Sequence, residues 1–364
     1  MKMKNHKLLL LVIPLLFLIV FGCSQKPESN EPKRLSEVYQ DYFPIGVAVS
    51  PRALKGDEAP LIRSQFASMT PENVMKMGPI HPEEDRYNWG PADEIVEFAR
   101  ANNMLLRGHT LCWHNQTPDW LFQPDSTLTK EELLSRLEAH ITAVVSRYKD
   151  DIYAWDVVNE VISSKPEEFY RESIWYRICG KDFIPKAFEY ARNADPDVEL
   201  YYNDYDVINP VKRERIYQMV RELMDARVPI DGVGIQGHWS VYEPTEDQLR
   251  ATISAFTDLG LKIQITELDA SIYEKEHSAR HPLPTDSDVF TDELKKKQAD
   301  QYEMIFRVLR DYKEHITGVT FWNISDRHSW LDNFPVKGRK DYPLLFDEEF
   351  QPKESFFRVV NFDK

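Results

Sequence analysis

The chain alternates between short apolar runs and longer amphipathic stretches over most of its length. The short runs are rich in aromatic and β-branched residues and are typical of buried strands, whereas the long stretches have the apolar spacing of helices that cover a core. Strands alternating with helices are characteristic of an α/β fold with parallel strands. We predict strands over residues 43–49, 68–70, 105–109, 151–160, 199–203, 233–238, 261–269 and 317–322.

Helix signals fall between these strands. Amphipathic spacing predicts helices that include 59–66, 93–102 and 130–148, and a closing helix that starts near Lys353. The third has the clearest start, because Thr129 is followed three residues later by Glu132 in the pattern of a capping box. Eight strand–helix units in one chain predict a single α/β domain folded as a (β/α)₈ TIM barrel.

Two of the predicted strands end in glutamate. Strand 151–160 finishes with Asn159 and Glu160, and strand 261–269 carries Glu267 near its end. Strand ends carry the chemistry of such barrels, because the loops that follow them line one open mouth. Hydrolysis of a glycosidic bond needs two carboxyl groups, one to protonate the leaving oxygen and one to attack the sugar or activate water. A lone strand-end glutamate is often a solvated carboxylate, so the prediction depends on the pair.

Polar and aromatic residues also follow the other predicted strands. These motifs are Thr70–Lys76, Gly108–His114, Tyr202–Tyr205, Gly234–His238 and Phe321–Trp322 with Asp326 and Trp330 beyond. With them, the chain resembles family 10 of the glycoside hydrolases, the endo-β-1,4-xylanases, from about Phe43 to its C-terminus. The motifs fall in order at seven of the eight strand ends.

The resemblance implies a function and a set of site residues. The implied reaction is hydrolysis of internal β-1,4-xylosidic bonds of xylan with retention, in which Glu160 is the general acid/base and Glu267 the nucleophile. The implied substrate contacts form three groups: Asn159, His109, Trp113 and Gln236 around the sugar being cleaved, Glu72, Asn73 and Lys76 at the next subsite on the non-reducing side, and Trp322 and Trp330 against the sugar rings. No cofactor is implied.

His238 resembles the family histidine that lies between the nucleophile and a second carboxylate, here Asp269. A histidine between two carboxylates can orient Glu267 and keep it ionised. Glu160 needs a proton to act as an acid, and the negative charge of Glu267 across the cleft favours that proton. The alternative for His238 is a core histidine bonded to backbone. A metal site with His109 and His114 is not expected, because the spacing of these residues is not that of metal ligands.

Some positions depart from the family pattern. Asn323 stands where the family usually has glycine, Asp206 stands in place of asparagine, and Ala270 replaces a larger apolar residue. None of these changes removes a catalytic group, but Asn323 is expected to reshape the cleft beside Trp322. The long polar segment 272–292 is expected to form a surface loop on the leaving-group side.

The N-terminus has the pattern of an export signal rather than of a folded element. Residues 1–22 combine a lysine-rich start with an apolar core that is short for a membrane span. The segment from Val20 to Cys23 resembles a bacterial lipoprotein processing site, with lipid attached to Cys23; an ordinary signal peptide with an incidental cysteine is the alternative. The polar composition of residues 23–36 predicts a flexible tether, which is followed by a catalytic domain over residues 37–364. Ser24 after the cysteine favours the outer membrane.

Composition narrows the choice of partners. The formal net charge of −15 argues against nucleic acid, which requires clustered lysine and arginine. Aromatic residues make up 12% of the chain, and those at strand ends suit the apolar faces of sugar rings. We expect a monomer. Cys112 and Cys179 could pair in an oxidising compartment, although the sequence alone leaves this open.

Two other functions remain compatible with the sequence. A β-1,4-glucanase or cellobiosidase on the same barrel would differ mainly by room for one hydroxymethyl group. A non-catalytic glycan-binding lipoprotein would keep the aromatic cleft, but it would have no need of two unlike carboxyl groups. The pair formed by Glu160 and Glu267 therefore favours the enzyme.

Overall fold

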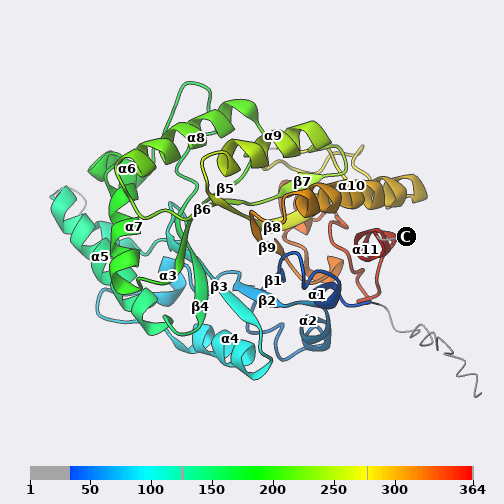
Figure 1. Ribbon diagram of the computed structural model, residues 1–364, viewed down its shortest axis with the longest axis horizontal. Coiled ribbons are helices and arrows are strands. Elements are labelled where there is room, and N and C mark those ends of the chain that lie inside the picture. Colours follow the sequence, from blue (N-terminus) through cyan, green and yellow to red (C-terminus); the bar gives the residue numbers. More distant parts are fainter. Residues whose placement is uncertain (1–32, 124–126, 277, 363–364) are drawn as a thin grey trace, which may run out of the picture. The chain divides into compact units, whose positions relative to one another are not determined.

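Parallel strands close into a barrel that is encircled by helices (Figure 1). The protein is represented by a computed structural model that describes residues 33–362, apart from 124–126 and 277. The strands are β1 (Ile45–Val49), β2 (Ser68–Pro71), β3 (Leu105–Cys112), β4 (Ile152–Asn159), β5 (Glu199–Asp204), β6 (Gly232–Ile235), β7 (His238–Ser240), β8 (Lys262–Ser271) and β9 (Ile316–Phe321).

The order of strand pairing confirms the predicted fold class. Neighbouring strands pair from β1 to β6, and β9 pairs with both β8 and β1. The parallel pairing of β6 with β8 closes the sheet, so that in the described part of the chain eight strands form a ring. Each of the eight predicted segments overlaps one strand of this ring. The strands are buried along almost their whole length, since side chains fill the barrel and helices cover its outside.

Helices surround the ring of strands on all sides in Figure 1. The predicted capping box is confirmed: the Thr129 hydroxyl accepts from the Glu132 backbone, and the Glu132 carboxylate accepts from the Thr129 backbone. The helices are α1 (Leu35–Val38), α2 (Ala59–Gln65), α3 (Met77–Ile80), α4 (Gly90–Ala101), α5 (Lys130–Arg147), α6 (Ile174–Cys179), α7 (Phe183–Ala194), α8 (Pro210–Asp225), α9 (Glu246–Thr257), α10 (Asp292–Asp311) and α11 (Glu354–Val360).

The sixth predicted strand, 233–238, is wrong at its end. Strand β6 stops at Ile235, and His238 begins the separate strand β7, which pairs with β8 so that His238 lies opposite Asp269. Gly237 between them has φ +75°, which glycine adopts without the steric cost that a side chain would impose. A Cβ there would also lie 2.9 Å from the Ile265 side chain. This bend directs His238 toward the mouth of the barrel.

The structure also bears on the predictions for the two cysteines and for segment 272–292. Cys112 and Cys179 are both buried and both carry free thiols, so the pair considered above is not formed. The described residues of segment 272–292 before Asp292, the first residue of α10, form a loop in which Arg280 makes ion pairs with Glu276 and Asp286. The predicted signal peptide and Cys23 lie outside the described residues. Among the residues that are described, no helix has the length and apolar character needed to cross a membrane.

Candidate active site

A cleft of about 740 Å³ opens where the strands end. This volume is in the range of small-ligand sites. Most residues singled out in the sequence line it together, although they come from six different strand ends: Glu72, Lys76, His109, Trp113, Asn159, Glu160, Gln236, His238, Glu267, Trp322 and Trp330. Asn73 and Asp269 do not line the cleft but contact residues that do, since Asn73 accepts from Lys76 and Asp269 bonds His238.

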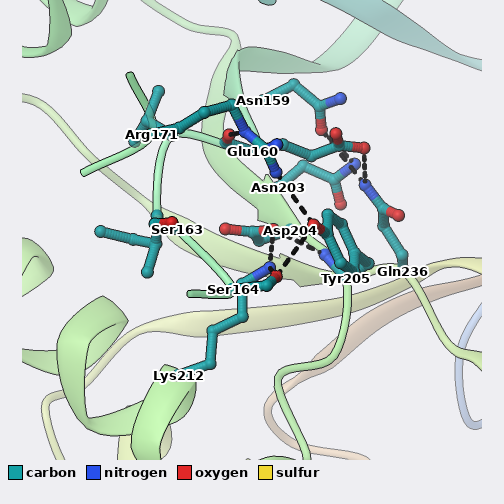
Figure 2. A network of polar contacts seen from close by, with 12 residues as sticks. Asn159, Glu160, Ser163, Ser164, Arg171, Asn203, Asp204, Tyr205, Lys212 and Gln236 are labelled. Atoms are coloured by element: carbon teal, nitrogen blue, oxygen red, sulfur yellow. Dashed lines mark hydrogen bonds and ion pairs between the residues drawn. The ribbon is translucent and has the colours of Figure 1, made fainter. Parts of the chain in front are cut away.

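The Glu160 carboxyl group is half-buried at the end of β4 and has two donors. The Trp113 indole nitrogen donates to Oε2 at 2.9 Å. The Gln236 amide donates to Oε1 at 2.9 Å (Figure 2). Its backbone has φ +59°, a left-handed conformation that is uncommon for residues with a side chain. Two hydrogen bonds to the Glu160 backbone hold this conformation. The Glu160 backbone amide donates to the Asn203 backbone oxygen, and Arg171 Nε donates to the Glu160 backbone oxygen, both at 2.9 Å.

Glu267 is buried at the end of β8 and is held as a carboxylate. Burial alone would raise its pKa, but the hydrogen bond and charge of His238, the charge of His109 and the hydrogen bond from Asn203 together lower the pKa to about 2. The Asn203 amide lies 2.9 Å from Oε1, and His238 Nε2 lies 3.1 Å from Oε2. Glu267 is therefore ionised at any pH near neutrality.

His238 connects Glu267 to a second carboxylate. Its Nδ1 lies 2.8 Å from Asp269 Oδ2, and the same oxygen accepts from the Trp330 indole nitrogen at 2.9 Å. Burial alone would lower the pKa of His238, but the adjoining Asp269 and Glu267 raise it to about 9. The imidazolium is thus the form present at neutral pH, and it donates to both carboxylates.

Glu160 and Glu267 share two partners. Asn203 contacts Glu160 through its backbone oxygen and Glu267 through its side-chain amide. Gln236 contacts Glu160 through its side chain and accepts from the Glu267 backbone amide at 2.7 Å. Each bridging residue thus bonds the carboxyl group of one glutamate and the backbone of the other, which holds both glutamates at the same mouth of the barrel.

A polar wall continues the cleft on the side of β2. Lys76 Nζ donates to Asn73 Oδ1 at 3.0 Å and lies 4.8 Å from the centre of the Trp113 ring. Burial lowers the pKa of Lys76, whereas the charges of Glu267, Glu72 and Glu160 act in the opposite direction. The wall thus offers a buried amine together with amide and carboxylate oxygens, which suits hydroxyl groups.

His109 is oriented by groups inside the barrel. Its Nδ1 lies 2.8 Å from Asp156 Oδ2, and both oxygens of Asp156 are also bonded by the buried Arg107 guanidinium. The His109 ring meets the edge of Trp322, with ring centres 5.4 Å apart. Its orientation is therefore set by buried groups rather than by solvent.

Aromatic rings form another part of the cleft. Trp330 lies 4.9 Å from His238 between ring centres and stacks on Phe334 at 5.6 Å. Trp322 meets His238 edge-on at 6.3 Å. Planar rings beside polar groups are typical of sugar-binding clefts, because pyranose rings have apolar faces.

The sequence interpretation did not assign several contributors to the site. Figure 2 shows them around Tyr205, whose hydroxyl accepts from Arg171 at 2.9 Å and lies 2.9 Å from the Ser164 hydroxyl. The buried Lys212 lies 3.4 Å from the Tyr205 ring centre and pairs with Asp204 at 2.8 Å. The polar run at the end of β5 could have indicated Asn203 and Tyr205. Arg171 lies in an irregular loop with no periodic signal.

The three positions that depart from the family pattern, Asn323, Asp206 and Ala270, differ in their burial and in whether they line the cleft. Asn323 has φ +116°, a conformation that favours glycine, and its Oδ1 lies 3.4 Å from the Trp330 amide. Asp206 lines the cleft. Ala270 is fully buried in the core, away from the cleft. Within loop 272–292, Lys275 and Glu276 also line the cleft, and Lys275 donates to the His238 oxygen at 2.8 Å.

The bond from His238 leads to a testable pH dependence. In a His238→Asn variant the positive charge is lost and burial dominates, so the pKa of Glu267 should rise from about 2 toward or beyond its ordinary 4.5. Protonated Glu267 cannot act as a nucleophile, so the acidic limb of kcat/KM should move upward by about 1–3 pH units. A pH profile measured with an aryl glycoside tests this. An unchanged acidic limb would show that His238 does not control the ionisation.

The fold and the site together define a chemical class. A (β/α)₈ barrel that holds an ionised carboxylate and a second, differently bonded carboxyl group across one cleft has the arrangement that glycoside hydrolysis requires. Among the residues the structure describes, no cluster of three or more histidine, cysteine or acidic side chains has the geometry of a metal site.

Comparison with known proteins supports this class. Residues 34–362 match the profile of Glycosyl hydrolase family 10. The chain is 47% identical to a β-1,4-xylanase of Dictyoglomus thermophilum over 99% of this chain and 100% of that one. It is 46% identical to endo-1,4-β-xylanase B of Paenibacillus barcinonensis, over 92% of this chain and 100% of that protein.

A solved structure shows the same fold. The crystal structure of a xylanase from Paenibacillus barcinonensis, in complex with a conduramine derivative, superposes with a TM-score of 0.86 at 46% identity. The superposition covers 91% of this chain and 99% of that one. The chain belongs to glycosyl hydrolase family 10.

Proposed function

We propose that the protein is a retaining endo-β-1,4-xylanase that cleaves internal bonds of xylan. One observation carries the assignment: Glu160 and Glu267 are tied to the same two residues at one cleft, yet their surroundings differ. Glu267 is bonded by an imidazolium and held ionised, whereas Glu160 is bonded by the neutral donors of Trp113 and Gln236. Two unlike carboxyl groups meet the needs of acid and nucleophile. The many xylanases among similar proteins support xylan as the substrate.

The first step breaks the glycosidic bond. Glu267 attacks the anomeric carbon and forms an ester with the sugar, while Glu160 gives its proton to the leaving oxygen. The negative charge of Glu267 is consumed as the ester forms. Glu160, which has given up its proton, is then a carboxylate that can act as a base.

The second step releases the sugar. Glu160 takes a proton from a water molecule, the oxygen attacks the anomeric carbon, and Glu267 leaves as a carboxylate. Two inversions at one carbon give net retention. His238 and Asn203 remain bonded to the Glu267 oxygens and stabilise its returning charge.

The other cleft residues are proposed to bind the chain of sugars. Asn159, His109, Trp113 and Gln236 would surround the sugar that is cleaved, and Trp322 and Trp330 would contact the flat faces of the rings. The wall formed by Glu72, Asn73 and Lys76 would hold the next sugar on the non-reducing side. Tyr205 would lie on the leaving-group side, with Lys275 and Glu276 of loop 272–292.

Product analysis tests the substrate assignment. The purified protein is incubated with xylan, arabinoxylan, mixed-linkage glucan and cellulose, and soluble products are separated by size. We expect a series of xylo-oligosaccharides from both xylans and at most a trace from cellulose. Faster release from glucan would favour a β-1,4-glucanase, for which the cleft must admit a hydroxymethyl group. Binding to xylan without any products would favour a glycan-binding protein.

We also propose that the protein is exported and anchored by lipid on Cys23, with xylan met at the outer membrane. The support is the sequence pattern of residues 1–23 alone. Expression in a bacterium with radiolabelled fatty acid should label the protein, and Cys23→Ala should abolish the label and release the enzyme from the membrane fraction. Equal membrane association of both forms would contradict this proposal.

A further inference from the structure

The loop of residues 160–173, which joins β4 to α6, folds back on itself beside the cleft. An antiparallel bridge closes this loop, and the Arg171 backbone amide donates to the Val161 oxygen at 2.8 Å. The half-buried Arg171 side chain is thereby placed against the Glu160 backbone, as Figure 2 shows. The residues that line the cleft do not include Arg171. Any effect of Arg171 on the reaction must therefore pass through other residues.

The Arg171 guanidinium connects Glu160 to Tyr205. Its Nε donates to the Glu160 backbone oxygen and its Nη2 donates to the Tyr205 hydroxyl, both at 2.9 Å. Burial alone would lower the pKa of Arg171, but Tyr205 and the charges of Glu160 and Asp204 raise it, so the side chain is always a cation. Because a guanidinium is planar and rigid, the two bonds fix the Tyr205 hydroxyl relative to the Glu160 peptide.

A second route of buried contacts joins the same two residues. The Tyr202 hydroxyl accepts from the two backbone amides that follow Glu160, at 3.2 and 3.3 Å. The same hydroxyl donates to Asp204 Oδ2, and Asp204 Oδ1 accepts from the Tyr205 backbone amide at 2.9 Å. The peptides on the C-terminal side of Glu160 are therefore bonded both by Arg171 and by Tyr202.

The conformation of Glu160 explains why its backbone needs these bonds. Its φ of +59° lies in the left-handed region, which residues with a side chain rarely adopt. A backbone in this region keeps its conformation only where its surroundings hold it there. Rotation about N–Cα to a more common φ would move the carboxyl group relative to β4. A proton donor must lie within hydrogen-bond reach of the leaving oxygen, so such a rotation would slow proton transfer.

Tyr205 lies at the wall of the cleft where the leaving sugar is proposed to bind. It lines the cleft together with Ser164 and Asn209. Its hydroxyl lies 2.9 Å from the Ser164 hydroxyl, and Lys212 Nζ lies 3.4 Å from the centre of its ring. A sugar packed against Tyr205 would therefore meet a residue that is held in place and is bonded to Arg171.

We propose that Arg171 is a positioning residue that couples the leaving-group side of the cleft to proton transfer. It holds the Glu160 peptide in its left-handed conformation and ties that peptide to Tyr205, so that the proton donor keeps its place relative to the leaving sugar. The inference rests on the proposed function, because it takes Glu160 as the acid/base and Tyr205 as part of the leaving-group side.

Two aryl xylobiosides test this role, because they differ in their need for a proton. Phenoxide is a poor leaving group that requires acid assistance, whereas dinitrophenoxide leaves without it. In Arg171→Ala, kcat for phenyl β-xylobioside should fall by about 30-fold with KM within about twofold of native, a part of the roughly 10²–10⁴-fold that acid catalysis contributes. For the dinitrophenyl substrate, kcat/KM should stay within about threefold of native, because attack by Glu267 needs no acid there.

Two further variants examine how Arg171 acts. Arg171→Lys should behave like Arg171→Ala, since an ammonium group cannot make both bonds of the guanidinium. Tyr205→Phe keeps the ring but removes the hydroxyl that accepts from Arg171, and kcat for the phenyl substrate should fall by about three- to tenfold. The double variant Arg171→Ala/Tyr205→Phe should be no slower than Arg171→Ala alone, because both substitutions break the same link.

Arg177→Ala is the matched control. This exposed arginine also donates to a backbone oxygen, that of Glu172 at 3.5 Å, but it bonds neither Glu160 nor Tyr205. Both substrates should be cleaved by Arg177→Ala at the native rate. Thermal unfolding curves check that each variant is folded. If Arg171→Ala does not fold, Arg171→Lys and Tyr205→Phe provide the same comparison of the two substrates.

The outcomes separate this inference from the proposed function. Equal losses on the two substrates, a higher KM with unchanged kcat, or no loss at all in the folded Arg171 variants would overturn the positioning role. Losses from Arg171→Ala and Tyr205→Phe that multiply in the double variant would overturn the coupling to Tyr205. Failure of the native protein to cleave either glycoside would contradict the proposed function itself, and this inference with it.

Discussion

Glu267→Ala should abolish measurable hydrolysis of xylan, with kcat reduced by at least about 10⁴-fold. The substitution removes the attacking group, and in concerted catalytic groups the loss of the nucleophile alone removes most of the rate enhancement. The same change leaves His238 with Asp269 as its remaining carboxylate partner, so the imidazolium stays paired. Release of reducing ends from xylan is the measurement.

Two further observations make the Glu267 result interpretable. Glu267→Gln keeps the size of the side chain and can still accept from Asn203, so it should be as inactive as the alanine variant while preserving the cleft. Circular dichroism and thermal unfolding should show a folded barrel for both. Activity above about one per cent of native in a folded, uncontaminated variant would rule out Glu267 as the nucleophile.

Glu160→Ala should have an effect that depends on the leaving group. Xylan has a poor leaving group that requires a proton, so its hydrolysis should fall by about 10²–10⁴-fold. A dinitrophenyl xylobioside leaves without a proton, so formation of the glycosyl–enzyme should slow far less. The later hydrolysis of the ester then becomes limiting, because no base activates water. Pre-steady-state kinetics should therefore show a burst of dinitrophenol followed by slow turnover.

An anionic nucleophile provides the control for Glu160. Azide needs no general base, so it should accelerate turnover of the dinitrophenyl substrate by Glu160→Ala and yield a β-glycosyl azide. Neither effect is expected for Glu267→Ala. Equal losses on xylan and on the dinitrophenyl substrate, with no response to azide, would be inconsistent with Glu160 as the acid/base.

The barrel could be predicted because its strands are buried on both faces. Apolar runs of aromatic and β-branched residues mark such strands in the sequence, and the capping box at Thr129 marks a helix start independently of tertiary contacts. The break after β6 could not be predicted in this way. It depends on the positive φ of Gly237 and on the pairing of His238 opposite Asp269, and neither is visible as periodicity.

The sequence predicted those site residues that lie at the ends of the strands. Glu160, Glu267 and His238 are adjacent to apolar runs, and a barrel brings all such ends to one mouth. Arg171 is different, since it reaches the Glu160 backbone from an irregular loop with no local signal.

In the proposed mechanism Glu267 attacks the sugar while Glu160 supplies the proton. The most direct measurement is to trap the ester with a dinitrophenyl 2-deoxy-2-fluoro-β-xylobioside, whose fluorine slows both steps while the good leaving group keeps the first one accessible. Mass spectrometry of the digested protein should then show one fluoroxylobiosyl group, attached to Glu267. A label on Glu160 or on another residue, or turnover with an inverted first product and no label, would contradict the account.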